Sequence, residues 1–248
     1  GRDYLAAKKI AFDHEILLLG PPSSHTWLFH GPFFYYLLAL SLLVFNASPF
    51  AGYFLVLLAF IFFFFLLYWF TKTVFGKSTA LVSLLFISVF PQAVALGRIP
   101  AHYTLVPLFS LISFMSLLLY FDKHKRFWLI ISGLAAGLAV QLHLSSVILV
   151  FFSAAVLLLG KKSKQIFTYL LFFSLPLLPI LIYDFGQKFA MTRMLLLWFP
   201  YRVIRFSWLS WQWVLAFILI SAACFWWSKR VRFNKLVFLP LFLAFSLL

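Results

Sequence analysis

Residues 127–159 read FWLIISGLAAGLAVQLHLSSVILVFFSAAVLLL, an apolar run of 33 residues without one charged side chain. A helical membrane crossing needs roughly 20 apolar residues, because an α-helix rises about 1.5 Å per residue and the hydrocarbon core is ~30 Å thick. The run is long enough for two short, tilted crossings, and its polar residues place a break between them at 141–146. The fold class that this stretch predicts is an all-α, polytopic transmembrane helical bundle.

The rest of the chain has the same character. Apolar residues make up 65% of the 248 positions and charged residues only 10%, whereas about a quarter of a soluble domain is charged. We expect one membrane domain over 1–248, with an outer loop of interfacial helices at 1–49 and, by length, about eight transmembrane segments in 50–248, the last cut short. The other apolar runs on which this rests are 50–70, 79–97, 103–121, 166–183, 209–227 and a final run from 236.

The positive charges lie in short clusters between the apolar runs. This pattern orients membrane proteins, so the net charge of +15 does not indicate nucleic-acid binding. Two apolar runs separate each cluster from the next, which puts all four on one face, the cytoplasmic one: Lys72/Lys77, Lys123/Lys125/Arg126, Lys161/Lys162/Lys164 and Lys229/Arg230/Arg232/Lys235. The segments 1–49, 97–103, 141–146 and 184–208 then lie outside, provided that 31–46 forms an interfacial or re-entrant helix that does not cross.

Acidic residues and histidines gather on the predicted outer face. Ionisable groups at a membrane are costly and by default mark function. We therefore expect the chemistry on this face, which holds four of the five acids and five of the six histidines: Asp3, Asp13, Glu15, Asp184, His14, His25, His30, His102 and His143.

Several short motifs of this face resemble one superfamily. Residues 30–40 read HGPFFYYLLAL and residues 1–10 read GRDYLAAKKI. The first is similar to the His-Pro-Pro-Leu-Tyr-Tyr motif of C-type glycosyltransferases, which include protein O-mannosyltransferases and the aminoarabinose transferase of lipid A. The second resembles the Asp-Gln-Gly-Arg-Asp motif of a bacterial branch. The resemblance continues at Gly97-Arg98, Gln141-Leu142-His143 and Tyr183-Asp184-Phe185.

The resemblance implies an inverting glycosyltransferase of the cell membrane. Such an enzyme moves a sugar from a polyprenyl-phosphate donor to an acceptor (glycan, lipid or protein) at the extracytoplasmic face. The lipid bilayer and the lipid-linked sugar are the expected partners. The substrate-binding residues that the resemblance implies are His30, Arg98, His102, Gln141, His143 and Asp184. Some relatives bind a divalent metal, but the sequence shows no ligand cluster with suitable spacing, so we assign no cofactor and no metal ligand.

The main catalytic acid is expected just before Gly1. In the related branch it is the Asp that begins the Asp-Gln-Gly-Arg-Asp motif, and this sequence opens at the Gly. We therefore expect a fragment, cut inside the membrane domain at both ends, that lacks this Asp. Asp3, the second acid of the motif, is the catalytic candidate within the chain.

Structural alternatives remain for these residues. Asp3 could cap the first helix, Arg98 could be an interfacial arginine that extends to water, and His143 could be a polar residue satisfied within a helix bundle. Three other functional classes also stay open: an O-antigen ligase or polymerase, a transporter, and a non-catalytic membrane subunit.

Overall fold

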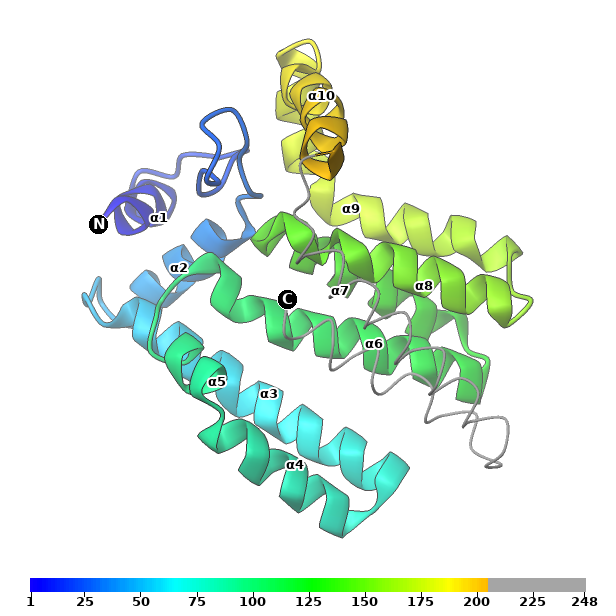
Figure 1. Ribbon diagram of the computed structural model, residues 1–248. Helices are drawn as coiled ribbons and strands as arrows, with labels where there is room; N and C mark the ends of the chain where they lie inside the picture. Colours follow the sequence, from blue (N-terminus) through cyan, green and yellow to red (C-terminus); the bar gives the residue numbers. More distant parts are fainter. Residues whose placement is uncertain (205–248) are drawn as a thin grey trace. The chain divides into compact units, whose positions relative to one another are not determined.

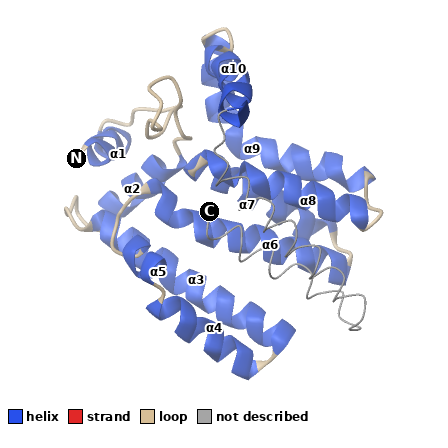
Figure 2. Ribbon diagram, viewed as in Figure 1, coloured by secondary structure: helices blue, strands red, loops and turns tan. Residues whose placement is uncertain are grey.

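The computed structural model describes residues 1–204, and in this part the regular structure consists of helices, without strands (Figure 2). The chain divides into two units, 1–188 and 189–248. The first unit contains α1 (Arg2–Phe12), α2 (Phe33–Val44), α3 (Ala51–Phe75), α4 (Lys77–Val89), α5 (Pro91–Leu96), the 3-10 helix η1 (His102–Leu105), α6 (Val106–Lys123), α7 (Arg126–Leu142), the 3-10 helix η2 (Leu144–Val147), α8 (Ile148–Leu159) and α9 (Lys164–Gly186).

The helices follow the apolar runs of the sequence. Three described segments are long and apolar enough to cross a membrane: Ala51–Phe75, His102–Lys123 and Lys164–Gly186. Four shorter apolar helices accompany them, namely Phe33–Val44, Lys77–Val89, Arg126–Leu142 and Leu144–Leu159. The predicted break in the 33-residue run is confirmed, because α7 ends at Leu142 and the chain is extended at His143. The protein is an all-α membrane helical bundle, as predicted.

The bundle exposes large apolar side chains on its outside. Lipid is as apolar as these side chains, so their exposure there has no hydrophobic cost. The long helices α3 and α9 contribute many of them, including Leu58, Phe62, Phe65, Phe167, Leu171, Leu178 and Ile182. This is the surface expected of a protein whose solvent is hydrocarbon.

Helix α7 lies at the centre of the first unit, against α6 on one side and α9 on the other (Figure 1). On the α6 side, Ser113 and Ser132 each donate a hydroxyl hydrogen bond to the other residue's carbonyl, at 2.9 and 2.8 Å. On the α9 side, a Cβ added at Gly133 would lie 2.7 Å from the Tyr169 carbonyl oxygen, and one at Gly137 would lie 2.4 Å from that of Phe173. Glycine at these two positions therefore lets the backbones of α7 and α9 touch.

The first helices form a layer of their own at one end of the unit. Helix α1 packs on α2 through Ala7 and Ala11 and leaves Leu5 and Phe12 exposed. The Tyr4 hydroxyl donates to the Pro49 carbonyl and accepts from the Gly52 N–H, both at 2.8 Å. These two hydrogen bonds fix α1 against the start of α3.

Within the segment 184–208, which the sequence predicts as an outer loop, most of the described residues, 184–204, are helical. Helix α9 continues to Gly186, and the second unit begins with α10 (Ala190–Ile204). Strong helix formers occupy Ala190-Met191 and Met194–Leu197, which explains the helix. The apolar runs predicted at 209–227 and from 236 lie outside the described residues.

Candidate functional site: three histidines at the helix ends

Three histidines that are far apart in the sequence come together in the first unit. His30 precedes α2, His102 begins η1, and His143 links α7 to η2. The ring centroids of His30 lie 4.6 Å from those of His102 and 5.4 Å from those of His143, and the His102 and His143 rings are 6.4 Å apart. We call these three residues the histidine cluster.

The backbone around His30 is held by a short antiparallel bridge. Its N–H donates to the Pro21 carbonyl and its own carbonyl accepts from the Gly20 N–H, both at 2.9 Å. An isolated β-bridge pairs Pro22 with Phe29 beside them. The proline-rich turn 20–23 therefore fixes the position of the His30 backbone.

The other two histidines stand where a helix begins or ends. At the end of α7 the His143 N–H still bonds the Ala139 carbonyl at 2.9 Å, while its Nδ1 lies 2.7 Å from the Ser145 hydroxyl oxygen. Ahead of η1, the Thr104 hydroxyl donates to the Ile99 carbonyl at 2.8 Å and closes the loop that carries His102. Each imidazole is thus presented by an ordered loop at a helix end.

Burial keeps the cluster uncharged at neutral pH. It lowers the pKa of His30 to about 3, with a further contribution from the neighbouring His102 and His143. Burial also lowers the pKa of His143 below its usual value. A neutral imidazole has one N–H donor and one bare nitrogen acceptor. The cluster therefore offers hydrogen bonds to a ligand and can take up protons when a negative charge arrives.

Charged residues of α1 lie beside the cluster. The Asp3 carboxylate accepts hydrogen bonds from the Arg2 guanidinium at 3.2 Å and from the Tyr35 hydroxyl at 3.3 Å. Both Arg2 and Asp3 are close enough to His102 for their charges to act on its imidazole. Asp3 does not cap α1, because the N-cap is Gly1 and no side chain closes the first turn. A carboxylate and a guanidinium thus lie near the His102 imidazole, and the Tyr35 phenol is hydrogen-bonded to that carboxylate.

Sequence reasoning did not single out Arg2 or Tyr35. Tyr35 belongs to the HGPFFYYLLAL run that carries the resemblance, and Arg2 adjoins Asp3 in the GRD motif. Their place in these two motifs was the signal that could have found them. The hydrogen bonds to Asp3 are what distinguish them from the neighbouring residues.

The remaining predicted site residues are placed differently. Gln141 is buried at 4% exposure, and its amide bonds to other parts of the chain. Arg98 follows α5, is exposed, and its guanidinium forms no hydrogen bond or ion pair with the residues that the structure describes. Asp184 is buried in the last turns of α9. The structure thus brings Asp3, His30, His102 and His143 together, and it does not bring Arg98 into contact with them.

The three rings form a compact group in which the closest pair, His30 and His102, is tilted by 35°. The His102 and His143 rings are inclined by only 10° and the His30 and His143 rings by 26°. Among the described residues, no group of three or more His, Cys, Asp or Glu side chains is arranged to hold a metal ion. We therefore assign no metal to the cluster and derive no step through one.

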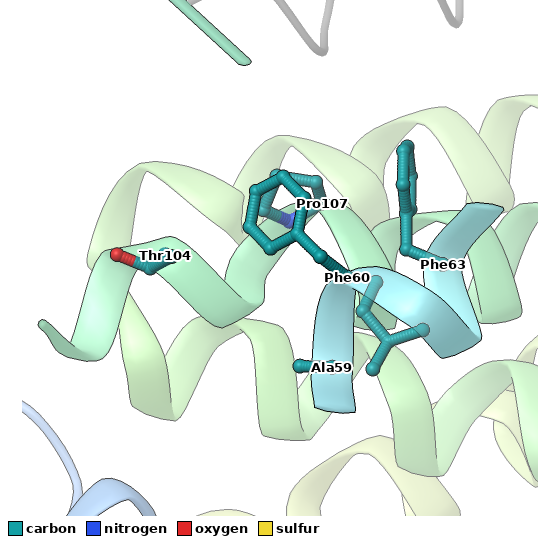
Figure 3. Close-up of a pocket in the computed structure, with 6 residues that line it drawn as sticks. Ala59, Phe60, Phe63, Thr104 and Pro107 are labelled. Carbon is teal, nitrogen blue, oxygen red and sulfur yellow. The ribbon is translucent and has the colours of Figure 1, made fainter. Parts of the chain in front are cut away.

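A small pocket is lined in part by residues close to His102 in the sequence, but its lining is apolar. Figure 3 shows Phe60 and Phe63 of α3 facing Pro107 of α6, with Thr104 at one end. Its lining is Ala59, Phe60, Phe63, Thr104, Pro107 and Leu108, which includes no titratable side chain. It is an apolar crevice between two crossing helices.

These features define a class: a polytopic, all-α membrane protein with a polar, ionisable site at the ends of its helices. A family model described as dolichyl-phosphate-mannose-protein mannosyltransferase matches residues 29–183. The match covers more than half of the chain and spans His30, His102, Gln141 and His143. The chain belongs to this family and is a membrane glycosyltransferase. No curated protein and no solved structure matches it.

Proposed function

We propose that this protein transfers a sugar from a polyprenyl-phosphate donor to an acceptor hydroxyl at the extracytoplasmic face of the cell membrane. The family match supports the donor class, since dolichyl-phosphate mannose is the donor that the family is described by. The observation that carries the assignment of the site is the group of three neutral imidazoles, one of which, His102, lies near Arg2 and Asp3. Phosphate needs hydrogen-bond donors from several directions, and the cluster draws them from three separate helix ends.

The reaction is a direct displacement at the anomeric carbon, with inversion. The bond from the acceptor oxygen to this carbon forms while its bond to the phosphate oxygen breaks, and polyprenyl phosphate leaves. The acceptor proton goes to an acid of the loop that contains α1. Asp3 lies in that loop, and the Asp-Gln-Gly-Arg-Asp motif of the related bacterial branch begins with its main catalytic acid, two residues before the Gly.

The histidines stabilise the departing phosphate. Negative charge builds up on the phosphate as the bond to the sugar breaks, and preorganised donors aimed at that charge lower the barrier. A nearby anion raises the pKa of an imidazole, so the cluster can take up a proton as the charge grows. Arg2 supplies a fixed positive charge next to the same site, held by its hydrogen bond to Asp3.

The test uses membranes that contain the full-length protein and polyprenyl-phosphate mannose with a radiolabelled sugar. We expect release of polyprenyl phosphate and transfer of the label. His30→Asn, His102→Asn and His143→Asn should each lower kcat/KM for the donor by roughly ten- to a hundredfold, the effect of one lost hydrogen bond to a charged group. His124→Asn is the matched control, because His124 is an exposed histidine with a left-handed backbone that Asn also tolerates. Full activity in all three cluster variants would overturn the assignment of the site.

A further inference from the structure

Gln141 is the point where three distant segments of the first unit meet. It lies in the last turn of α7, and it is buried at 4% exposure. Its Oε1 accepts a hydrogen bond from the Phe33 N–H at the start of α2, at 3.1 Å. Its Nε2 donates to the Pro176 carbonyl of α9. One side-chain amide therefore joins α7 to both α2 and α9.

The main chain of Gln141 contributes a third connection. Its carbonyl accepts from the Gly31 N–H at 2.9 Å. Both ends of the side chain and the backbone carbonyl thus bond to other parts of the protein. The amide keeps one further N–H and one further lone pair, but at 4% exposure little of its surface is open to a phosphate or sugar.

Gly31 lies in direct contact with the Gln141 side chain. A Cβ at position 31 would lie 2.3 Å from the Gln141 Oε1 and 2.5 Å from its Cγ. The loop behind is equally close, since a Cβ at Gly20 would lie 1.9 Å from the Gly31 carbonyl oxygen. Gly20 is therefore packed on the Gly31 backbone, and Gly31 on the Gln141 side chain.

These contacts determine the spacing of two imidazoles. His30 immediately precedes Gly31, and His143 follows Gln141 by two residues. The two rings lie 5.4 Å apart. Because Gln141 bonds Gly31 and Phe33 on one side and carries His143 on the other, its amide sets the distance between the two rings.

We propose that Gln141 is a positioning residue: it does not contact the donor, but it holds the His30 and His143 segments together through hydrogen bonds to α2 and α9. This replaces the substrate-binding role that the sequence suggested for it. The catalytic consequence rests on the proposed function, whereas the geometric consequence does not. The experiment therefore needs a readout of each kind.

Two substitutions separate hydrogen bonding from packing. Met has nearly the shape of Gln and no amide, so Gln141→Met removes both side-chain hydrogen bonds. Glu offers the same acceptor and donor as Gln when it is protonated, but it cannot donate to the Pro176 carbonyl when ionised. Because burial raises the pKa of a carboxyl group, Gln141→Glu should regain function relative to the wild type as the pH falls, and Gln141→Met should not. Gln92→Met is the matched control, because Gln92 is exposed on α5.

The geometric readout is cross-linking. With Cys224 replaced by Ser, cysteines at positions 30 and 143 are joined in membranes by a short reagent with two thiol-reactive ends. We expect Gln141→Met to lower the yield by roughly tenfold, on the scale of a lost buried hydrogen-bond pair, and Gln92→Met to leave it unchanged. The kinetic readout is kcat and KM with polyprenyl-phosphate mannose, and we expect Gln141→Met to lower kcat by a similar factor.

Each result decides the matter. Unchanged cross-linking in Gln141→Met with a raised KM for the donor would mean that Gln141 contacts the donor directly, which overturns the proposal. Unchanged cross-linking and kinetics would overturn it as well. Lower cross-linking in Gln141→Met supports it even if the wild type does not use the donor, in which case the proposed function fails alone. If Gln141→Met does not fold, the pH dependence of Gln141→Glu decides: a ratio to the wild type that stays flat from about pH 8 to about pH 5.5 contradicts the proposal.

Discussion

At the scale of the residue, the feature of most consequence is a histidine that is buried without its charge. His30 is 6% exposed and has the imidazoles of His102 and His143 as neighbours, with Asp3 and Arg2 beyond them. An ionised imidazole in such surroundings would lose its hydration and be repelled by any charge on its neighbours. The site is therefore built from the neutral form, and protonation opposes folding.

We predict that the thermal stability of the protein falls below neutral pH because of this residue. The folded-state pKa of His30 is about 3 and the ordinary value is 6.5. Because the pKa of His30 is lower in the folded state, the contribution of neutral His30 to the free energy of unfolding is complete at pH values above 6.5. This contribution is lost as the pH falls from 6.5 toward 3. In detergent, the decrease in Tm between about pH 7.5 and about pH 5 should be smaller in His30→Asn than in the wild type.

His124→Asn should keep the full decrease of the wild type, because His124 is exposed. An equal decrease in His30→Asn and the wild type would show that His30 is not the group responsible.

The sequence singled out the members of the cluster only with the help of the resemblance. Charge parity predicts five histidines and four acids on the outer face, and the motifs of the resemblance selected His30, His102, His143 and Asp3 among them. The sequence did not predict the hydrogen-bonding role of Gln141. The sequence around a glutamine at the end of an apolar run looks the same whether the amide faces a ligand or another helix. The partners of the Gln141 amide, Phe33 and Pro176, are 108 and 35 positions away in the sequence.

At the scale of the element, the backbones of α7 and α9 approach each other closely at two glycines of α7. Gly133, Gly137 and Gln141 are four residues apart, so they lie on one stripe of α7. The two glycines let the α9 backbone approach, and Gln141 then reaches the Pro176 carbonyl. The apolar runs predicted the positions of these helices. Because each run is apolar on all sides of its helix, it did not predict which faces of α7 and α9 meet.

Substituting alanine for either glycine should separate the two helices. The new Cβ would meet a backbone carbonyl of α9 at 2.7 Å in Gly133→Ala and at 2.4 Å in Gly137→Ala. Overpacking of a close interface typically costs about 1–3 kcal/mol. We expect that loss in the free energy of unfolding, measured by denaturation in detergent, together with a lower rate of donor use.

Gly186→Ala serves as the comparison for this pair. Nothing lies within 4 Å of a Cβ at Gly186, and the position is the last of α9. Its stability should be unchanged or slightly raised, because alanine favours the helix more than glycine does. Wild-type stability in Gly133→Ala and Gly137→Ala would mean that the helices do not meet through these residues.

At the scale of the whole molecule, the proposed function depends on which side of the membrane each loop occupies. The charge clusters predict Lys72, Lys123 and Lys161 inside, and the loops that carry the histidines outside. The described helices follow the predicted apolar runs in position, and three of them are long and apolar enough to cross a membrane. The two faces themselves stay a prediction.

Labelling of single cysteines in intact cells would test the topology. With Cys224 replaced by Ser, cysteines at Ser24 and Gln187 should react with a thiol reagent that does not cross the membrane, and cysteines at Lys72, Lys123, Lys161 and Arg230 should react only after the cells are opened. The first five positions are exposed, and Arg230 lies outside the described residues. Labelling of position 161 from outside would reverse the assignment of the faces.

The bond from Gln141 to Pro176 also has a consequence for the order of events during biosynthesis. The chain enters the membrane from its N-terminus, so the Phe33 N–H is already present when Gln141 arrives, 108 residues later. The partner on α9 arrives only after a further 35 residues, when α8 has passed. Until then the Gln141 amide has an unpaired donor and the glycine stripe of α7 has no helix against it. The histidine cluster can reach its final spacing only after α9 has been inserted, so a chain interrupted before residue 176 would hold the histidines without the frame that aligns them.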